Sequence, residues 1–539
     1  MSRTEWSSSW RSRYGPHWRA WLTLFILLLV ARGFIETLSD ADLPMHLAIG
    51  EWIVRHGTVP FVEPFAWTRA GAPFYAYSWA MDVVLYGVAD VSGKIGLRLL
   101  NGLLVAAAFA AMIVLGRAAR WDPRTALLMG VMNIVIMSVI VNSVRPQALL
   151  FTLIPLAWAL TYWTLDSERP GRALLGIAAV SAVAANTHIF FPLTAIPWLL
   201  FIDRTPAERW RVYAVIAVTV AGWLLSPYTL VLGDVFALST QPNPVLKPPS
   251  SITEAQPGFV IMRQNWILLP IAVFLSALPW MVRREDHSGR RRLAWGIAWV
   301  LGMIAFASGV RLLLVWWMLI LPLVAEAFQR MASYLLATEQ QSVRLWRITA
   351  VWFVCSLLFL SLKPFDEEAW RFENPAGTSR RLARMEWTGL EQIAQWLECN
   401  ARPDARGRVF TDFNFGSALT WRLPRYSMSV DGRTIFPDSV AKAEAFYDPF
   451  RERLRLGPWR SADLAIMPVP SAIGDVLDRA PEWRKAAIAH TAETSTALWV
   501  TQAWWSRAGK NTFTRSESLL PGRPSPDSGC SRNMPASNR

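Results

Sequence analysis

The sequence is poor in charged residues, cysteine and histidine. Charged residues make up 17% of the 539-residue chain, whereas soluble domains carry about 25%, so the length does not indicate three or four soluble domains. The three cysteines, Cys355, Cys399 and Cys530, lie far apart and have no metal-ligand spacing. They predict neither a zinc site nor a disulfide framework.

Several catalytic and nucleic-acid-binding signatures are missing as well. We find no nucleophile elbow, P-loop, dinucleotide fingerprint or HExxH motif, which disfavours hydrolases and nucleotide-dependent enzymes. The formal net charge is +14, but the sequence has no zinc-finger spacing, aromatic RNA-binding signature or basic tail. Its arginines instead cluster in short gaps between apolar runs, as they do in membrane proteins. We therefore expect no nucleic-acid partner.

Long apolar runs and tryptophan are what the chain does contain. Hydrophobic residues make up 53% of it, the mean hydropathy is +0.26, and there are 30 Trp, a residue that favours membrane–water interfaces. The runs predict an α-helical polytopic membrane domain over residues 18–363, with about eleven spanning helices. The expected spans are 18–35, 97–116, 125–142, 148–165, 173–187, 189–202, 212–230, 266–282, 293–309, 311–328 and 347–363.

The distribution of arginine predicts the orientation of these helices. Alternate gaps are rich in arginine, and the positive-inside rule places them in the cytoplasm. Residues 1–17 are expected to form a cytoplasmic N-terminal segment before a retained anchor; the alternative is a cleaved signal peptide. The large 36–96 loop and everything after about residue 364 are expected outside. We predict a multi-pass protein of the plasma (inner) membrane, in contact with membrane lipids.

The chain after the last apolar run predicts a separate extracytoplasmic α/β domain over residues 364–505. Residues 386–399 are expected to be helical, and a small, partly parallel sheet is expected from four strand-like segments. These segments are GRVFTDF (407–413), YSMSV (426–430), ADLAIMPV (462–469) and TALWV (496–500). Residues 506–539 are rich in Ser, Pro, Arg and Asn and predict a disordered tail.

Two acids, Asp40 and Asp42, follow directly on the first apolar run. Such carboxylates could hold a divalent cation, Mg²⁺ or Mn²⁺, because these ions prefer oxygen ligands. One of them could instead act as a general base on an acceptor hydroxyl. Acids after a helix are also common as solvated loop residues. In the same loop, residues 43–56 and 78–91 are expected to form interfacial helices along the membrane surface.

Further ionisable residues are predicted at the same outer face, where charge near membrane depth is costly and tends to be functional. Each has an ordinary structural alternative, because an arginine can anchor a helix end and a lone histidine often serves the fold. An arginine can equally clamp a phosphate with its planar fork of donors. The candidate substrate-binding residues are His46, Arg145, His188, Glu254 and Arg311.

The order of small motifs in the first outer loop has a known counterpart. The stretch SDADLPMHLAIGEWIVRHGTVPFVEPFAWTRAGAPFYAYSWAMDVVLYG (39–87) resembles the first outer loop of bacterial GT-C-type membrane glycosyltransferases. These are relatives of the protein mannosyltransferases and the lipid A aminoarabinose transferases. The motifs are the acids, His46 with Gly50, a Gly-x-x-Pro turn at 57–60, Glu63-Pro64-Phe65 and Trp79. Later stretches agree: VRPQALLFTL (144–153), AANTHIFF (184–191), LLSPYTL (224–230) and GRVFTDFNFGSALTWRLPRYSMSVDGR (407–433).

The resemblance implies a GT-C-like membrane fold and an activity. A sugar would pass from a polyprenyl-phosphate donor to a lipid, glycan or protein acceptor by inverting transfer at the extracytoplasmic face. Asp40 matches the acid that serves such enzymes as a base or metal ligand, and Asp42 is the second candidate. Glu63 stands where the family more often has Asp, and no Trp-Trp-Asp-Tyr-Gly motif is present. Transfer to protein asparagine is therefore not indicated.

Two other functions remain open at this point. A transporter or flippase for lipid-linked sugars would also need a polytopic bundle, but it is expected to show inverted repeats and broken helices near the midplane. We detect no such repeat, and the ionisable residues are predicted at one face. A non-catalytic assembly protein of the cell envelope would keep the fold and tolerate loss of the acids.

Overall fold

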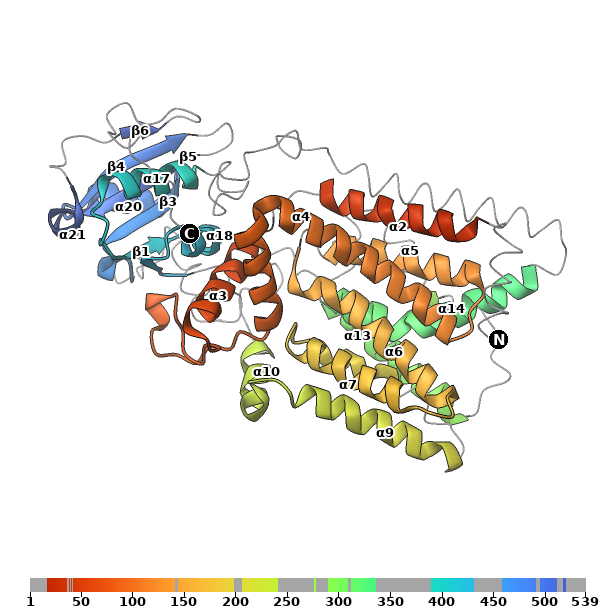
Figure 1. The fold of residues 1–539 in the computed structure, drawn as a ribbon. Helices are drawn as coiled ribbons and strands as arrows, with labels where there is room; N and C mark the ends of the chain where they lie inside the picture. Colours follow the sequence, from red (N-terminus) through yellow and green to blue (C-terminus); the bar gives the residue numbers. More distant parts are fainter. Residues whose placement is uncertain are drawn as a thin grey trace. The chain divides into compact units, whose positions relative to one another are not determined.

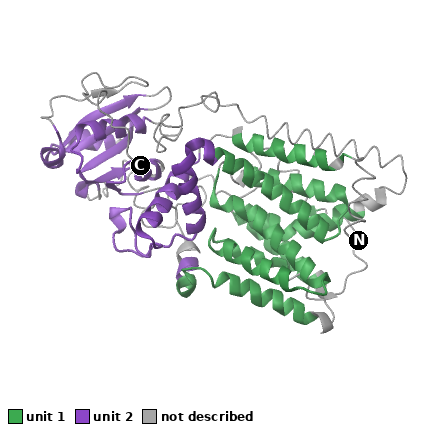
Figure 2. Ribbon diagram, viewed as in Figure 1, with its two compact units in different colours: residues 1–37, 98–233, 246–371 green, residues 38–97, 234–245, 372–539 purple. Residues whose placement is uncertain are grey.

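A computed structural model describes the chain in segments that fall into two compact units (Figure 2). The described residues are 17–35, 38, 40, 42–140, 144–197, 206–240, 276–277, 289–308, 312–335, 389–430, 458–490, 495–510 and 517–519. Unit 1 comprises residues 1–37, 98–233 and 246–371, and unit 2 comprises 38–97, 234–245 and 372–539. The first outer loop expected from the sequence therefore shares a unit with the C-terminal part of the chain.

Unit 1 is a bundle of apolar helices (Figure 1). Neighbours in the chain pack together, α6 against α7, α7 against α9 and α13 against α14. The short 3-10 helices η2 (Pro146–Leu149), η3 (Phe191–Ala195) and η4 (Thr229–Val231) lie between longer elements. The helix α10 (Leu232–Thr240) follows η4 and belongs to unit 2 from Asp234 on. The long helices are α2 (Trp18–Ile35), α4 (Trp79–Ala118, in this unit from Arg98), α5 (Pro123–Ile140), α6 (Leu150–Asp166), α7 (Gly171–Ala185), α9 (Pro206–Trp223), α13 (Gly289–Ser308) and α14 (Leu313–Leu335).

Three described helical segments are long and apolar enough to cross a membrane: Trp79–Ala118, Pro146–Asp166 and Leu313–Arg330. Four shorter apolar helices accompany them, at Leu22–Phe34, Pro123–Ser138, Gly171–Ala185 and Leu293–Ser308. The expected count of about eleven spans is therefore not confirmed.

The expected spans differ in how they match the helices. Spans 266–282 and 347–363 lie largely or wholly outside the described residues, and within 189–202 the described helical structure is η3 and the two residues that follow it. Most of the expected interfacial segment 78–91 and the span 97–116 form one helix, α4. Non-helical backbone at Gly93 (φ 57°, ψ −148°) interrupts α4 between them.

Polar and small side chains hold the helices of unit 1 close together. Asn133 on α5 is fully buried, and its Nδ2 donates to the carbonyls of Ala108 (3.2 Å, α4) and Phe151 (3.1 Å, α6). Its Oδ1 accepts a bond of 2.9 Å from Trp317 Nε1 on α14. A Cβ atom on Gly33 of α2 would lie 2.5 Å from Gly102 Cα of α4. Close backbone approach at glycine and buried amide bonds are typical of helix packing in membranes.

Replacing Asn133 with leucine is expected to destabilise the bundle by about 1–2 kcal/mol, because the Trp317 N–H is then buried without its acceptor. Unfolding of the purified protein in detergent measures the loss. The double variant Asn133→Leu/Trp317→Phe removes both partners, so it should lose less stability than the sum of the two single variants. Strict additivity would contradict a coupling between these side chains.

Unit 2 contains a six-stranded sheet with the order β2-β1-β3-β5-β4-β6. The strand β1 pairs in parallel with β2 and β3, β5 pairs antiparallel with β3 and β4, and β4 pairs in parallel with β6. The partly parallel sheet expected from the sequence is therefore present. The strands are β1 (Gly407–Thr411), β2 (Tyr426–Met428), β3 (Leu464–Val469), β4 (Trp483–His490), β5 (Ser495–Thr501) and β6 (Glu517–Leu519).

Two strands of the sheet, β4 and β6, were not expected from the sequence, and neither was a disulfide at Cys399. The sequence did not predict β4, which is rich in alanine and begins Trp-Arg-Lys, since neither feature favours a strand. The strand β6 lies within the tail that was expected to be disordered. Cys399 is disulfide-bonded, so the expectation from cysteine spacing was incomplete.

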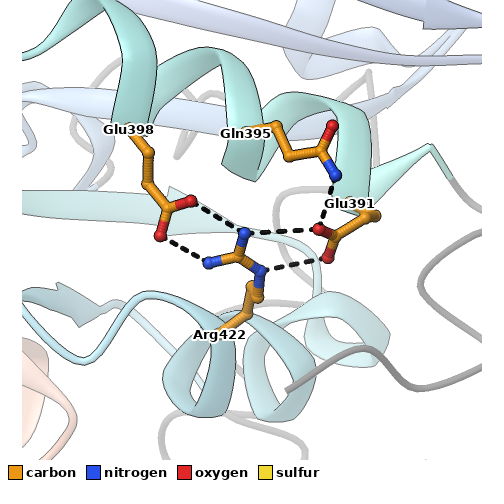
Figure 3. Close-up of polar contacts among 4 residues, drawn as sticks. All are labelled: Glu391, Gln395, Glu398 and Arg422. Carbon is orange, nitrogen blue, oxygen red and sulfur yellow. Dashed lines mark hydrogen bonds and ion pairs between the residues drawn. The ribbon is translucent and has the colours of Figure 1, made fainter. Parts of the chain in front are cut away.

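Among the described residues of this unit, four helices pack around the sheet: α17 (Leu390–Asn400), α18 (Phe413–Arg422), α20 (Ala472–Arg479) and α21 (Gln502–Ala508), with the 3-10 helix η10 (Pro458–Ser461). An ion cluster links α17 to α18 (Figure 3). The guanidinium of Arg422 donates to Glu391 Oε2 (Nε, 3.0 Å) and to Glu398 Oε1 (Nη1, 2.6 Å), and Gln395 Nε2 donates to Glu391 Oε1 (2.9 Å). The cluster fixes α18, which also packs against α3 (Leu43–His56).

Part of the 36–96 loop covers the edge of the sheet at β2. Ala66 pairs with Met428 in a parallel bridge, and Ser427 Oγ donates to the Phe65 carbonyl at 2.7 Å. The short helix η1 (Trp67–Arg69) follows, where Trp67 Nε1 donates to the Val409 carbonyl (3.3 Å) and Trp67 packs against the sheet core. An exposed edge strand is a template for aggregation. The loop thus protects the sheet, and both form one body.

Candidate functional site

The candidate site begins where the acids lead into α3. The backbone N–H of Asp42 donates to Asp40 Oδ1 at 2.8 Å, which turns the chain into the helix. Asp42 occupies the N-cap position, and Pro44 lies in the first turn, where its missing N–H costs nothing. The helix ends at Gly57, which adopts a left-handed conformation (φ 67°). Asp40 is buried, and Asp42 is half-buried.

A histidine on α3 meets a buried acid on α4. His46 Nδ1 lies 2.7 Å from Asp82 Oδ1, and Ser78 Oγ donates to both carboxylate oxygens of Asp82, at 3.1 Å and 3.0 Å. The Asp82 side chain is 0% exposed, whereas the His46 side chain is 20% exposed. Ser78 directly precedes α4, and Asp82 lies in its first turn, so the two side chains meet at the N-terminal end of the helix. The positive end of the helix dipole also favours a carboxylate there.

The close approach of α3 and α4 depends on Gly50, one turn after His46. A Cβ atom at this position would clash with the backbone carbonyl of Asp82 and lie 2.7 Å from Tyr86 Cβ. Because residues i and i+4 of a helix lie on the same face, Gly50 makes the space that lets His46 reach Asp82. A small apolar core beneath these helices, Met45, Ile49, Ile53, Phe74 and Ala76, fixes their packing.

The electrostatic surroundings of His46 favour its protonated form. Burial opposes the charge, but the negative charge of Asp82 and its hydrogen bond, with smaller contributions from Asp42 and Asp40, raise the pKa of His46 above its ordinary value of 6.5. Since the Nδ1 atom is engaged by Asp82, the Nε2 atom is the one that can exchange a proton with a bound molecule. The arrangement can therefore accept a proton and stabilise the resulting imidazolium.

The structure brings together three of the predicted residues, Asp40, Asp42 and His46. Arg145 and His188 belong to unit 1. Arg145 is half-buried and precedes η2, and its carbonyl accepts the Ala148 N–H at 3.0 Å. His188 is half-buried after α7, and its Nδ1 accepts the Phe190 N–H at 3.3 Å. Glu254 and Arg311 lie outside the described residues.

Sequence reasoning missed Asp82 and Ser78. Both stand in SWAMDVVLYG, which was interpreted only as an apolar surface helix. The signal that could have found them is a lone acid in an otherwise apolar segment, preceded four residues earlier by a hydroxyl. A buried acid needs hydrogen-bond or charge partners, so such an acid predicts a partner on another element.

The carboxylates of Asp40 and Asp42 are of the type that holds Mg²⁺ or Mn²⁺. In the parts of the chain that the structure describes, no group of three or more His, Cys, Asp or Glu side chains is arranged to hold a metal ion. A metal at Asp40 and Asp42 stays a prediction from the sequence.

Comparison with known proteins adds no family to this description. Neither the protein-family models nor the curated protein sequences that we searched give a match to the chain.

Proposed function

We propose that the protein is a membrane glycosyltransferase that moves a sugar from a polyprenyl-phosphate carrier to an acceptor at the extracytoplasmic face, with inversion at the anomeric carbon. The observation that carries the proposal is the cluster of Asp40, Asp42, His46 and Asp82, of which the first three residues come after the apolar helix α2 in the sequence. The acids occupy the place where the resemblance to GT-C-type enzymes expects the catalytic carboxylate. Perturbed, partly buried titratable groups of this kind are typical of functional sites.

The chemistry that this reaction demands matches the predicted residues. The acceptor oxygen attacks the anomeric carbon while the bond from that carbon to the phosphate oxygen breaks, so the hydroxyl proton must be taken up. A carboxylate at Asp40, with Asp42 beside it, can take that proton or stabilise the group that does. The departing phosphate needs cationic donors, for which Arg145 and Arg311 are the candidates. His188 and Glu254 are further candidates for substrate binding.

The location follows from the same features. The 36–96 loop and the sheet share one compact unit, which supports the proposal that both lie on the same side of the membrane. The Cys399 disulfide is a bond that persists in oxidising compartments, which favours the extracytoplasmic side. The arginine-rich gaps then place the N-terminus in the cytoplasm, and the apolar helices suit the polyprenyl chain of the donor. The plasma membrane is the proposed site.

Asp40→Asn is expected to reduce sugar transfer at least about 100-fold, because the loss of a proton-accepting or charge-stabilising group typically costs that much or more. The assay uses the purified protein in lipid vesicles with radiolabelled polyprenyl-phosphate mannose or polyprenyl-phosphate aminoarabinose. Membrane extract supplies the acceptor. Labelled product is separated from the donor and counted.

The matched control is Asp90→Asn, which changes an exposed acid on α4 and should leave the rate unchanged. Equal rates for Asp40→Asn and the wild type would remove Asp40 from the mechanism. Movement of the labelled donor across the vesicle membrane without product would favour the transporter. Neither transfer nor movement would favour a non-catalytic assembly protein.

A further inference from the structure

The two ring nitrogens of His46 lie in different surroundings. Nδ1 is held 2.7 Å from Asp82, which is itself fixed by Ser78 and fully buried. Nε2 makes no hydrogen bond with any residue that the structure describes, and the side chain is 20% exposed. A histidine with one nitrogen fixed by a buried carboxylate has a defined ring orientation and tautomer. When the ring is neutral, its other nitrogen is presented as a proton acceptor.

We propose that His46, rather than Asp40, is the general base that takes the proton from the acceptor hydroxyl, and that Asp82 and Ser78 are its positioning residues. This inference rests on the proposed glycosyl transfer and identifies the group that performs its proton step. Asp40 and Asp42 then stabilise the positive charge that His46 acquires when it takes up the proton.

The geometry separates the two candidate bases. Asp40 is 5% exposed, and its Oδ1 already accepts the Asp42 N–H at 2.8 Å, a bond that shapes the entry into α3. A base must come within hydrogen-bond reach of the proton that it removes. His46 is the more exposed of the two residues and points one nitrogen away from its partner. Asp40 is better placed to stabilise charge than to contact an acceptor.

The charged groups around His46 are predominantly acidic. Asp82 comes from α4, and Asp42 and Asp40 come from the segment before α3. Glu51 on α3 is paired with Arg55 at 2.6 Å. From α18, which packs against α3, the cation is Arg422, and it is engaged by Glu391 and Glu398. The three aspartates raise the proton affinity of His46 and compensate the positive charge when it is protonated.

The proton step balances without another reactant. The acceptor oxygen forms a bond to the anomeric carbon, and its proton passes to His46 Nε2. The bond between the anomeric carbon and the phosphate oxygen breaks, and its electron pair leaves with the polyprenyl phosphate. The imidazolium is stabilised by Asp82 until it returns its proton to water. The histidine–aspartate pair thus works as it does in hydrolytic triads, here with a sugar acceptor as nucleophile.

The test compares pH profiles of transfer for the wild type, His46→Gln, Asp82→Asn and the control His56→Gln. His56 is exposed on the same helix and stacks on Trp52. We expect His46→Gln to lower kcat by about 10²–10⁴-fold with little change in KM, the range for loss of a general base. The wild-type rate should rise with pH through the raised pKa of His46. In Asp82→Asn this rise should move to lower pH, because the main group that raises the pKa is gone.

Each outcome of this test either supports or overturns the role of His46 as the general base. Suppose that the wild type transfers sugar while His46→Gln keeps the same rate, or while Asp82→Asn keeps the same pH profile. Either result overturns the inference about His46 and leaves the proposed glycosyl transfer intact. No turnover by the wild type with either donor overturns both. If His46→Gln fails to fold, the pH profile of Asp82→Asn decides, because this variant keeps the histidine. A purely structural role of Asp82 would not shift that profile. A loss of rate in His56→Gln equal to that in His46→Gln also overturns the inference.

Discussion

Gly50→Ala is expected to separate α3 from α4 and to abolish the His46–Asp82 hydrogen bond. The new methyl group would clash with the Asp82 carbonyl, and the nearest side-chain atom, Tyr86 Cβ, would lie only 2.7 Å away. A backbone carbonyl cannot rotate aside as the end of a flexible side chain can, so the helices must move. Overpacking of this kind typically costs roughly 1–3 kcal/mol, and occasionally more.

Two measurements check this expectation. Thermal unfolding in detergent should show the loss of stability, and the transfer assay should show a loss of activity approaching that of His46→Gln. The matched control is Gly87→Ala on α4, where a Cβ atom would meet nothing within 4 Å. That control should be neutral or stabilising by up to about 1 kcal/mol, as expected for alanine in a helix. Equal behaviour of the two variants would show that Gly50 is not a point of close approach.

Arg422→Met is expected to destabilise unit 2 by about 3–5 kcal/mol, the usual cost of removing one partner from a buried ion pair. Arg422 and Glu391 are 9% and 6% exposed at their side chains. Burial alone would oppose the charge of Arg422, but its bonds to Glu398 and Glu391 raise its pKa above the ordinary value. Without the guanidinium, Glu391 keeps Gln395 as a hydrogen-bond donor but loses its counter-charge (Figure 3).

The control for this variant is Arg507→Met. Arg507 is 72% exposed and lies 3.5 Å from Asp463, and exposed pairs contribute about 0–1 kcal/mol. Denaturant unfolding followed by tryptophan fluorescence measures the loss, and Trp459, Trp483 and Trp499 in the core of the sheet contribute to the signal. A loss for Arg422→Met no larger than for Arg507→Met would mean that the cluster does not hold α17 to α18. Because α18 packs against α3, we also expect transfer to weaken with the fold.

Much of the local structure could be predicted because it depends on patterns within one segment. The first apolar run matches α2 (Trp18–Ile35), and the runs at 125–142 and 173–187 correspond to α5 and α7. All four strand-like segments correspond to strands, since short apolar runs rich in β-branched and aromatic residues favour buried sheet positions. The count of spans is not confirmed, because composition alone cannot fix where each helix begins and ends.

The residues that contact or position His46 from elsewhere in the chain could not be predicted in the same way. Asp40, Asp42 and His46 could be recognised from the sequence because they lie together, in residues 40–46, soon after the first apolar run. Asp82 lies 36 residues from His46, and no periodicity connects them. Gly50 was part of a motif, but its role appears only when the carbonyl of Asp82 is found opposite it.

The sequence by itself determined that the chain is rich in apolar helices, that acids follow the first of them, and that an α/β sheet lies near the C-terminal end. Local chemistry suffices for these features, because each depends on neighbours in the chain. Only the tertiary structure decided that residues 38–97 fold with that sheet, that Arg422 links α17 to α18, and that a buried aspartate orients His46. Such pairings depend on helix crossings and strand order. Helix crossings and strand order are set by the packing of the whole unit, so no sequence pattern within a single segment predicts them.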